Sequence, residues 1–291
     1  MQSRKHLIKH TRAEKRKEQT RILKRRIILF ACMAVTLTGV LAWGSGMSQI
    51  SIADVRVEGT MLADAGAIKA NVEHNLEGRY GYLFSKRNIL LFSKKAIIAD
   101  VLASFHRIEV VTLGHDAGNI LVVTVTERKP SLVWCPAPVS DDIVSSGTIS
   151  PISCYFTDRD GIIYAPAPTF SAPVFFTWYG PLLDAARSAE GNRFLSPDEF
   201  ATVSGIVEEI KRAGIKPLSG TIGVEDIRMA TGTIGDVIFK RGQNASEVVN
   251  NLTAARKAIP SDVLLEYVDL RFGTKVFYKE KEVEHVMNVS G

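Results

Sequence analysis

The chain has 291 residues, 46% hydrophobic and 23% charged, which is enough for two folded domains with cores of their own. Its formal net charge of +5 is unevenly distributed. Residues 1–26 carry eleven Lys/Arg against Glu14 and Glu18, a net of +9, and the remainder carries 25 Lys/Arg against 29 Asp/Glu, a net of −4. The basic excess therefore belongs to the N-terminal tail, and a basic nucleic-acid-binding body is disfavoured.

An uncharged, largely apolar segment over 27–47 follows this tail. It supplies the about 20 residues that a helix needs to cross a bilayer core, and Trp43 near one end suits the membrane interface. Because the basic residues precede it, we expect a single-pass protein of the cytoplasmic membrane, with 1–26 inside against membrane lipid and the residues after about 48 outside. A cleaved signal peptide is the competing interpretation, but 26 residues make a long charged region and no clear A-x-A site follows.

The residue pattern over 48–128 predicts the order strand, helix, helix, strand, strand. Apolar residues alternate with polar ones over 50–58, which is typical of a strand. Two helices follow, one with apolar residues at helical spacing between Ala65 and Leu76, and one capped by Ser93. Residues 79–92 are expected to form a loop. The β-forming runs 108–113 and 120–127 complete this unit.

Residues 129–280 alternate between β-forming runs and two amphipathic helices. The helices are expected from Ser196 to Gly214 and from Asn244 to Pro260, because each pairs a capping residue with a helix-ending one. Strands are expected at 131–135, 154–157, 162–164, 220–224, 227–229, 236–240, 264–270 and 275–279. The Pro-, Ser- and Gly-rich stretch 136–152 and the charged tail 281–291 are expected to be loose. The fold class is therefore α+β, preceded by one transmembrane helix.

Three cysteines are present, and Cys32 lies inside the apolar segment. Cys135 and Cys154 border the stretch 136–152, with 18 residues between them. Outside the cytoplasm these two are expected to form a disulfide, and two small buried thiols are the alternative. No metal-binding cysteine spacing occurs.

The sequence offers no catalytic or cofactor-binding motif. Asp158 and Asp160 precede Gly161, but the glycine comes too early for a calcium-binding loop, so we interpret 158–161 as a hairpin turn. The six histidines are scattered, and no pair of carboxylates stands out as an acid and a base. The expectation is a protein that is not an enzyme, with no cofactor, no metal, no nucleic acid and no small-molecule substrate.

Three motifs are similar to those of a known family. Residues 52–59 match I-x-x-V-x-V-x-G, and residues 125–134 match V-x-E-R-x-P-x-x-x-W. Near the end of the chain, residues 267–272 read Y-V-D-L-R-F, where the family has I-D-L-R-F/Y. Together with the N-terminal anchor, they resemble the FtsQ/DivIB family of bacterial cell division proteins, over about 25–280.

The resemblance implies a POTRA domain over 48–128 and a mainly antiparallel β domain backed by helices over 129–280. It also implies a scaffold at the division septum that recruits and holds FtsB/FtsL-like membrane proteins, linking early and late division steps. The candidate partner-binding residues are Tyr267, Arg271, Lys275, Val276, Phe277 and Tyr278. The alternative roles are core packing for Val276 and for the neighbouring Val268, and an internal ion pair for Arg271. A membrane-anchored cell-wall-modifying enzyme and a POTRA-type polypeptide chaperone are the alternative functions.

Overall fold

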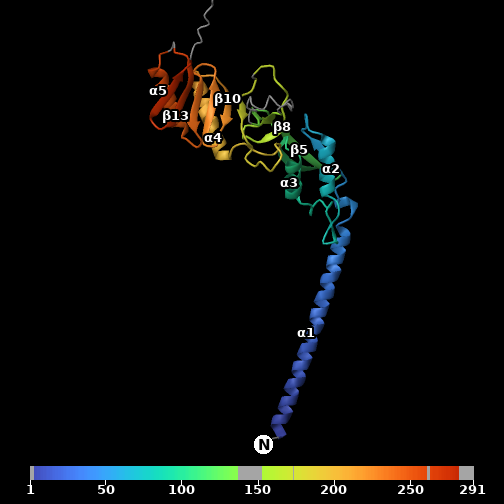
Figure 1. The fold of residues 1–291 in the computed structure, drawn as a ribbon. Helices are drawn as coiled ribbons and strands as arrows, with labels where there is room; N and C mark the ends of the chain where they lie inside the picture. The colour runs from blue at the N-terminus through green and yellow to red at the C-terminus, as the bar shows by residue number, and fades with distance from the viewer. Residues whose placement is uncertain (1–2, 137–152, 173, 261–262, 282–291) are drawn as a thin grey trace, which may run out of the picture. The chain divides into compact units, whose positions relative to one another are not determined.

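A computed structural model describes residues 3–136, 153–172, 174–260 and 263–281, with side chains from residue 19 onward (Figure 1). The stretch 137–152 and the tail 282–291, both expected to be loose, lie outside the described residues. The fold combines α and β elements, with one N-terminal apolar helix and a large mixed sheet. The chain divides into two compact units, 1–105 with 110–126, and 106–109 with 127–291.

The first unit begins with a long helix, α1 (Ser3–Gly44). Its part Gln19–Gly44 contains an 18-residue window with a mean hydropathy of 2.1, and it is long and apolar enough to cross a membrane. At 1.5 Å per residue, these 26 residues span about 39 Å, which exceeds a bilayer core of about 30 Å. The expected segment 27–47 runs three residues past the end of this helix. The chain turns at Ser45, whose hydroxyl donates to the carbonyl of Ala42 over 2.7 Å.

The rest of the first unit has two helices and a three-stranded sheet in the strand order β1-β5-β4. β1 pairs with β5, and the two strands are parallel. Short apolar side chains on α2 and α3 pack on the sheet because they recur at helical spacing; Ile68, Val72, Ile97 and Val101 are almost fully buried. The elements after α1 are η1 (Ser48–Ile50), β1 (Asp54–Glu58), α2 (Ala65–Asn75), β2 (Arg79–Tyr80), β3 (Phe84–Ser85), α3 (Lys94–Ser104), β4 (Ile108–Asp116) and β5 (Ile120–Glu127).

The second unit contains a nine-stranded sheet with two helices packed on it. The strand order is β14-β13-β12-β11-β10-β9-β6-β7-β8, and Figure 1 labels β13, β10 and β8 of this sheet. Its elements are β6 (Leu132–Cys135), β7 (Tyr155–Thr157), β8 (Ile163–Pro166), β9 (Thr177–Tyr179), α4 (Pro197–Arg212), β10 (Pro217–Ile222), β11 (Asp226–Thr231), β12 (Asp236–Lys240), α5 (Ala245–Ala258), β13 (Leu265–Phe272) and β14 (Lys275–Glu280).

The sheet is mixed, with antiparallel pairings in the majority, as expected for the second domain. Among the described strands, β6–β9, β9–β10 and β12–β13 pair in parallel, and the other five pairings are antiparallel. The parallel pairing β12–β13 follows from the intervening helix α5, since a parallel connection needs a crossover. β9 was not among the expected strands.

The core of the second unit lies between the sheet and the two helices. Trp178 from β9, Phe239 from β12 and Ile210 from α4 are at most 2% exposed. α4 begins with the capping box that the sequence predicts, in which Ser196 and Glu199 exchange hydrogen bonds. Burial of one large apolar side chain contributes about 1.5–3 kcal/mol, so this core is the main source of stability for the sheet.

Candidate functional site

The candidate partner-binding residues all lie in the hairpin β13–β14, at one end of the nine-stranded sheet. The two strands are antiparallel, with Val268 opposite Tyr278 and Asp269 opposite Phe277. They are joined at Gly273, whose φ of +65° is a conformation that glycine adopts at no steric cost. The structure therefore brings the six predicted residues together on neighbouring strands.

β14 is an open edge of the sheet. It pairs with β13 on one side, and in the described part of the chain no strand pairs with its other side. In an antiparallel edge strand, every second residue points its backbone N–H and C=O away from the sheet. Five of the six residues of β14 are exposed, and Val276 is half-buried. This strand can therefore take a further strand from another chain.

The opposite edge, β8, is closed by the chain itself. The amide of Ile163 donates to the carbonyl of Asn192 over 3.0 Å, and the amide of Gly191 donates to the carbonyl of Ile163 over 2.8 Å. β8 then ends in Pro166, which has no N–H to offer. Among the residues that the structure describes, the two edges of the sheet thus differ, and β14 is the one left available for pairing.

Exposed aromatic side chains accompany the open edge. Phe272 and Phe277 are 53% and 52% exposed, and their rings meet edge to face with 5.2 Å between the centroids. Tyr278 is 47% exposed on the other face of β14. Aromatic side chains of this kind supply large contact area at protein interfaces. Phe272 was not among the predicted residues, although its place at the end of the Y-V-D-L-R-F motif is the signal that would have included it.

Two predicted residues are engaged within their own domain. Val276 packs against the core. The guanidinium of Arg271 makes hydrogen bonds of 2.9 and 2.6 Å to the carboxylate of Asp269 and one of 2.8 Å to Asp226. Burial opposes charge at Asp269, but the hydrogen bonds from Arg271 outweigh it and hold the pKa of this carboxyl below its usual value. Arg271 therefore braces β13 against the start of β11.

The remaining predicted residues of β13 and β14 are Tyr267 and Lys275. Tyr267 is half-buried and stands opposite Asp236 of β12 and Lys279 of β14. Lys275 is exposed at the start of β14. The nearby ion pair between Lys279 and Glu266, 2.7 Å long, ties the two strands together on the surface.

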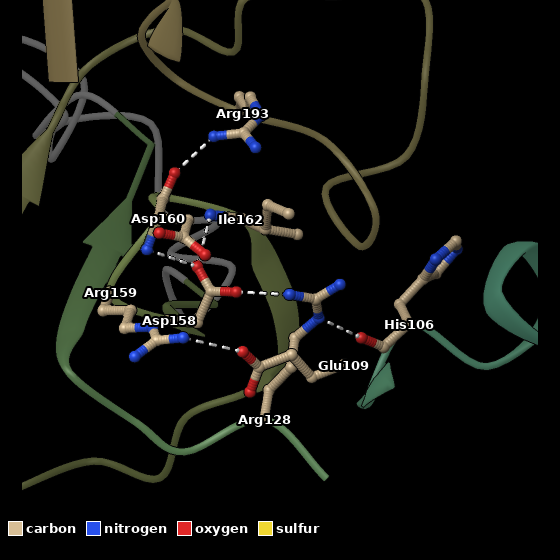
Figure 2. A network of polar contacts seen from close by, with 8 residues as sticks. All are labelled: His106, Glu109, Arg128, Asp158, Arg159, Asp160, Ile162 and Arg193. Atoms are coloured by element: carbon tan, nitrogen blue, oxygen red, sulfur yellow. Dashed lines mark hydrogen bonds and ion pairs between the residues drawn. The ribbon is translucent and has the colours of Figure 1, made fainter. Parts of the chain in front are cut away.

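Arg128 of the E-R-x-P motif lies in a buried polar network in the second unit (Figure 2). Its guanidinium pairs with the carboxylate of Asp158, and its Nε donates to the carbonyl of His106 over 3.0 Å. The same carboxylate accepts the amides of Asp160 and Ile162, each over 2.9 Å, which closes the turn. Asp158 thus binds an arginine and two backbone amides.

Cys135 and Cys154 form a disulfide in the structure, with their Cα atoms 4.3 Å apart. The bond links the end of β6 to the residue before β7, two strands that pair with each other. Cys32 is a free and exposed residue of α1. In the part of the chain that the structure describes, no group of three or more His, Cys, Asp or Glu residues is placed to hold a metal ion.

A scan of the chain against models of known protein families finds no match, and a search among curated proteins finds none either.

Proposed function

We propose that this chain is a membrane-anchored scaffold of the FtsQ/DivIB type that holds FtsB/FtsL-like division proteins by strand addition. The observation that carries the proposal is the open edge β14, flanked by the exposed pair Phe272 and Phe277. Backbone pairing along an edge supplies affinity, and the exposed side chains that alternate along the strand supply specificity.

Two further features support the proposal. α1 contains a helix long and apolar enough to cross a membrane, so it would hold the second unit at a membrane surface beside small membrane partners. The first unit has the element order β1-α2-β2-β3-α3-β4-β5, and its helices and the sheet β1-β5-β4, taken without the short hairpin β2–β3, follow the order β-α-α-β-β that a POTRA domain would have.

The proposal is tested by co-purification of the full chain with FtsB/FtsL-like proteins from detergent-solubilised membranes. Phe277→Asp places a charge on the open edge and should reduce the recovered partner at least about tenfold, the equivalent of 1.4 kcal/mol. Leu183→Asp is the matched control, because Leu183 has nearly the same exposure, 54% against 52%, and lies in the loop before α4. Its partner recovery should equal that of the unaltered chain.

Equal recovery with both variants would contradict binding at this edge. Both variants should keep the fluorescence of the buried Trp134 and Trp178, which reports that the second unit is folded.

A further inference from the structure

The loop that carries β2 and β3 is hydrogen-bonded to the residues that follow α1. The amide of Ser85 donates to the hydroxyl of Ser45 over 3.3 Å, and the side-chain amide of Asn88 donates to the carbonyl of Ser45 over 3.0 Å. Ser45 and Asn88 are only 5% and 2% exposed. A buried polar pair of this kind fixes the hairpin at the end of the helix, because breaking it leaves unpaired polar groups.

Backbone pairing extends this connection. The amide of Ile89 donates to the carbonyl of Ile50 over 2.9 Å, and the amide of Ile52 donates to the carbonyl of Arg87 over 2.8 Å. Backbone hydrogen bonds thus hold the residues around Asn88 against the segment that follows α1.

Large apolar side chains are exposed at this place. We call Trp43, Tyr82, Leu83, Leu90 and Leu91 the juxtamembrane surface; their exposed fractions are 74%, 94%, 51%, 81% and 46%. A hollow of about 400 Å³ lies between the end of α1 and the hairpin β2–β3, since Trp43 and Met47 line it together with Tyr82 and Leu83. Such a cluster is costly in water, so it marks a contact surface.

Basic side chains accompany the apolar ones. Arg79 is exposed at the start of the hairpin, and Lys86 and Arg87 follow it, half-buried. The ammonium of Lys86 lies 5.9 Å from the centre of the Tyr80 ring. Glu77, paired with His74, is the acidic residue just before the hairpin. Basic and aromatic side chains around a helix end are the combination found at membrane–water interfaces.

We propose that the juxtamembrane surface lies in the headgroup region of an anionic bilayer and holds the first unit on the membrane. The inference rests on α1 crossing the membrane. The bilayer is the expected occupant because this surface begins at the last turn of the apolar helix, so lipid lies at its depth whenever α1 is inserted. The division partners proposed above are not needed for it.

The experiment uses the full chain in vesicles that contain phosphatidylglycerol, with an environment-sensitive fluorophore on one cysteine and the disulfide left oxidised. Native Cys32 reports on α1. Leu90→Cys in a Cys32→Ser background reports on the juxtamembrane surface. Leu62→Cys in the same background is the matched control, because its exposure is 77% against 81% for Leu90. Leu62 follows the far end of β1, whose five residues rise about 13 Å from Asp54.

Spin-labelled lipids then locate each fluorophore. We expect mid-chain labels to quench the fluorophore at Cys32, and headgroup labels to quench position 90 at least about twofold more than position 62. Quenching at Cys32 with equal, weak quenching at 90 and 62 overturns the inference and leaves the membrane helix standing. No quenching at Cys32 overturns both the inference and the anchor of the proposed function. Strong quenching at 90 that appears only after FtsB/FtsL-like proteins are added also overturns it, because lipid would then not be the occupant.

Discussion

Replacing Arg128 by methionine should strongly destabilise the second unit. The side chains of Arg128 and Asp158 are 13% and 4% exposed, so the substitution leaves a carboxylate buried without its cation. Removing one partner of a buried ion pair costs about 3–5 kcal/mol. Asp158 keeps its two backbone donors, which places the cost at the low end of that range. The lost hydrogen bond to His106 adds about 1 kcal/mol, and we expect about 4 kcal/mol in total.

The assay is urea unfolding of the full chain in detergent micelles, followed by the fluorescence of the buried Trp134 and Trp178, with Trp43 replaced by Phe. Arg159→Met is the matched control, because Arg159 pairs with Glu109 at the surface with 79% of its side chain exposed. This control should change the free energy of unfolding by less than about 1 kcal/mol. The double variant Arg128→Met/Asp158→Asn should lose less free energy of unfolding than the sum of the losses in the two single variants.

A loss below about 1 kcal/mol for Arg128→Met would refute the reasoning, because the buried pair would then contribute no more than a surface pair.

Three further predictions concern the second unit. Gly161→Ala should destabilise it by about 2 kcal/mol in the same urea assay, because Gly161 has a φ of +74° and an added Cβ would stand 2.8 Å from the Phe200 ring. Reducing the Cys135–Cys154 bond, which closes a loop of sequence separation 19, should lower stability by about 3 kcal/mol, measured by urea unfolding with and without a thiol reductant. The pKa of Asp269 is lower in the folded chain than in the unfolded chain, so on acidification the unfolded chain binds the proton first. Stability should therefore be full above the unfolded pKa of about 3.9 and fall as the pH drops through the lower folded pKa, with a smaller fall in Asp269→Asn. Equal acid sensitivity of Asp269→Asn and the unaltered chain would contradict this last prediction.

Local signals in the sequence predicted most helices well. Ser93, Ser196 and Asn244 are found at the N-caps that their positions indicated, and each accepts backbone hydrogen bonds there. Such signals act within a few residues, so the amino-acid sequence is enough to locate them.

Features that depend on distant residues were not predicted. β9 has only three residues, and it becomes a strand because β6 and β10 pair with it on its two sides. The short hairpin β2–β3 was expected to be a loop, since two-residue strands leave no periodicity to detect. The parallel pairings also escaped prediction because a run of β-forming residues does not reveal its neighbour.

At the candidate edge, too, the strands were predicted from local signals, whereas the open state of the edge depends on distant residues. The motif at 267–272 and the following run led to β13 and β14. The sequence could not show that β8 would be closed by the loop around Asn192 while β14 stayed open, because both facts depend on tertiary pairing. It also left Arg271 between partner binding and an internal ion pair, and the structure places Arg271 against Asp269 and Asp226.

Hydrogen–deuterium exchange of the full chain, with and without a bound FtsB/FtsL-like protein, tests strand addition most directly. The amides of β14 should exchange more slowly in the complex because an added strand would pair with the outward-facing ones, whereas the amides of β8 should keep their rates. A stable complex in which exchange along β14 is unchanged would contradict the account, because the partner would then be held elsewhere.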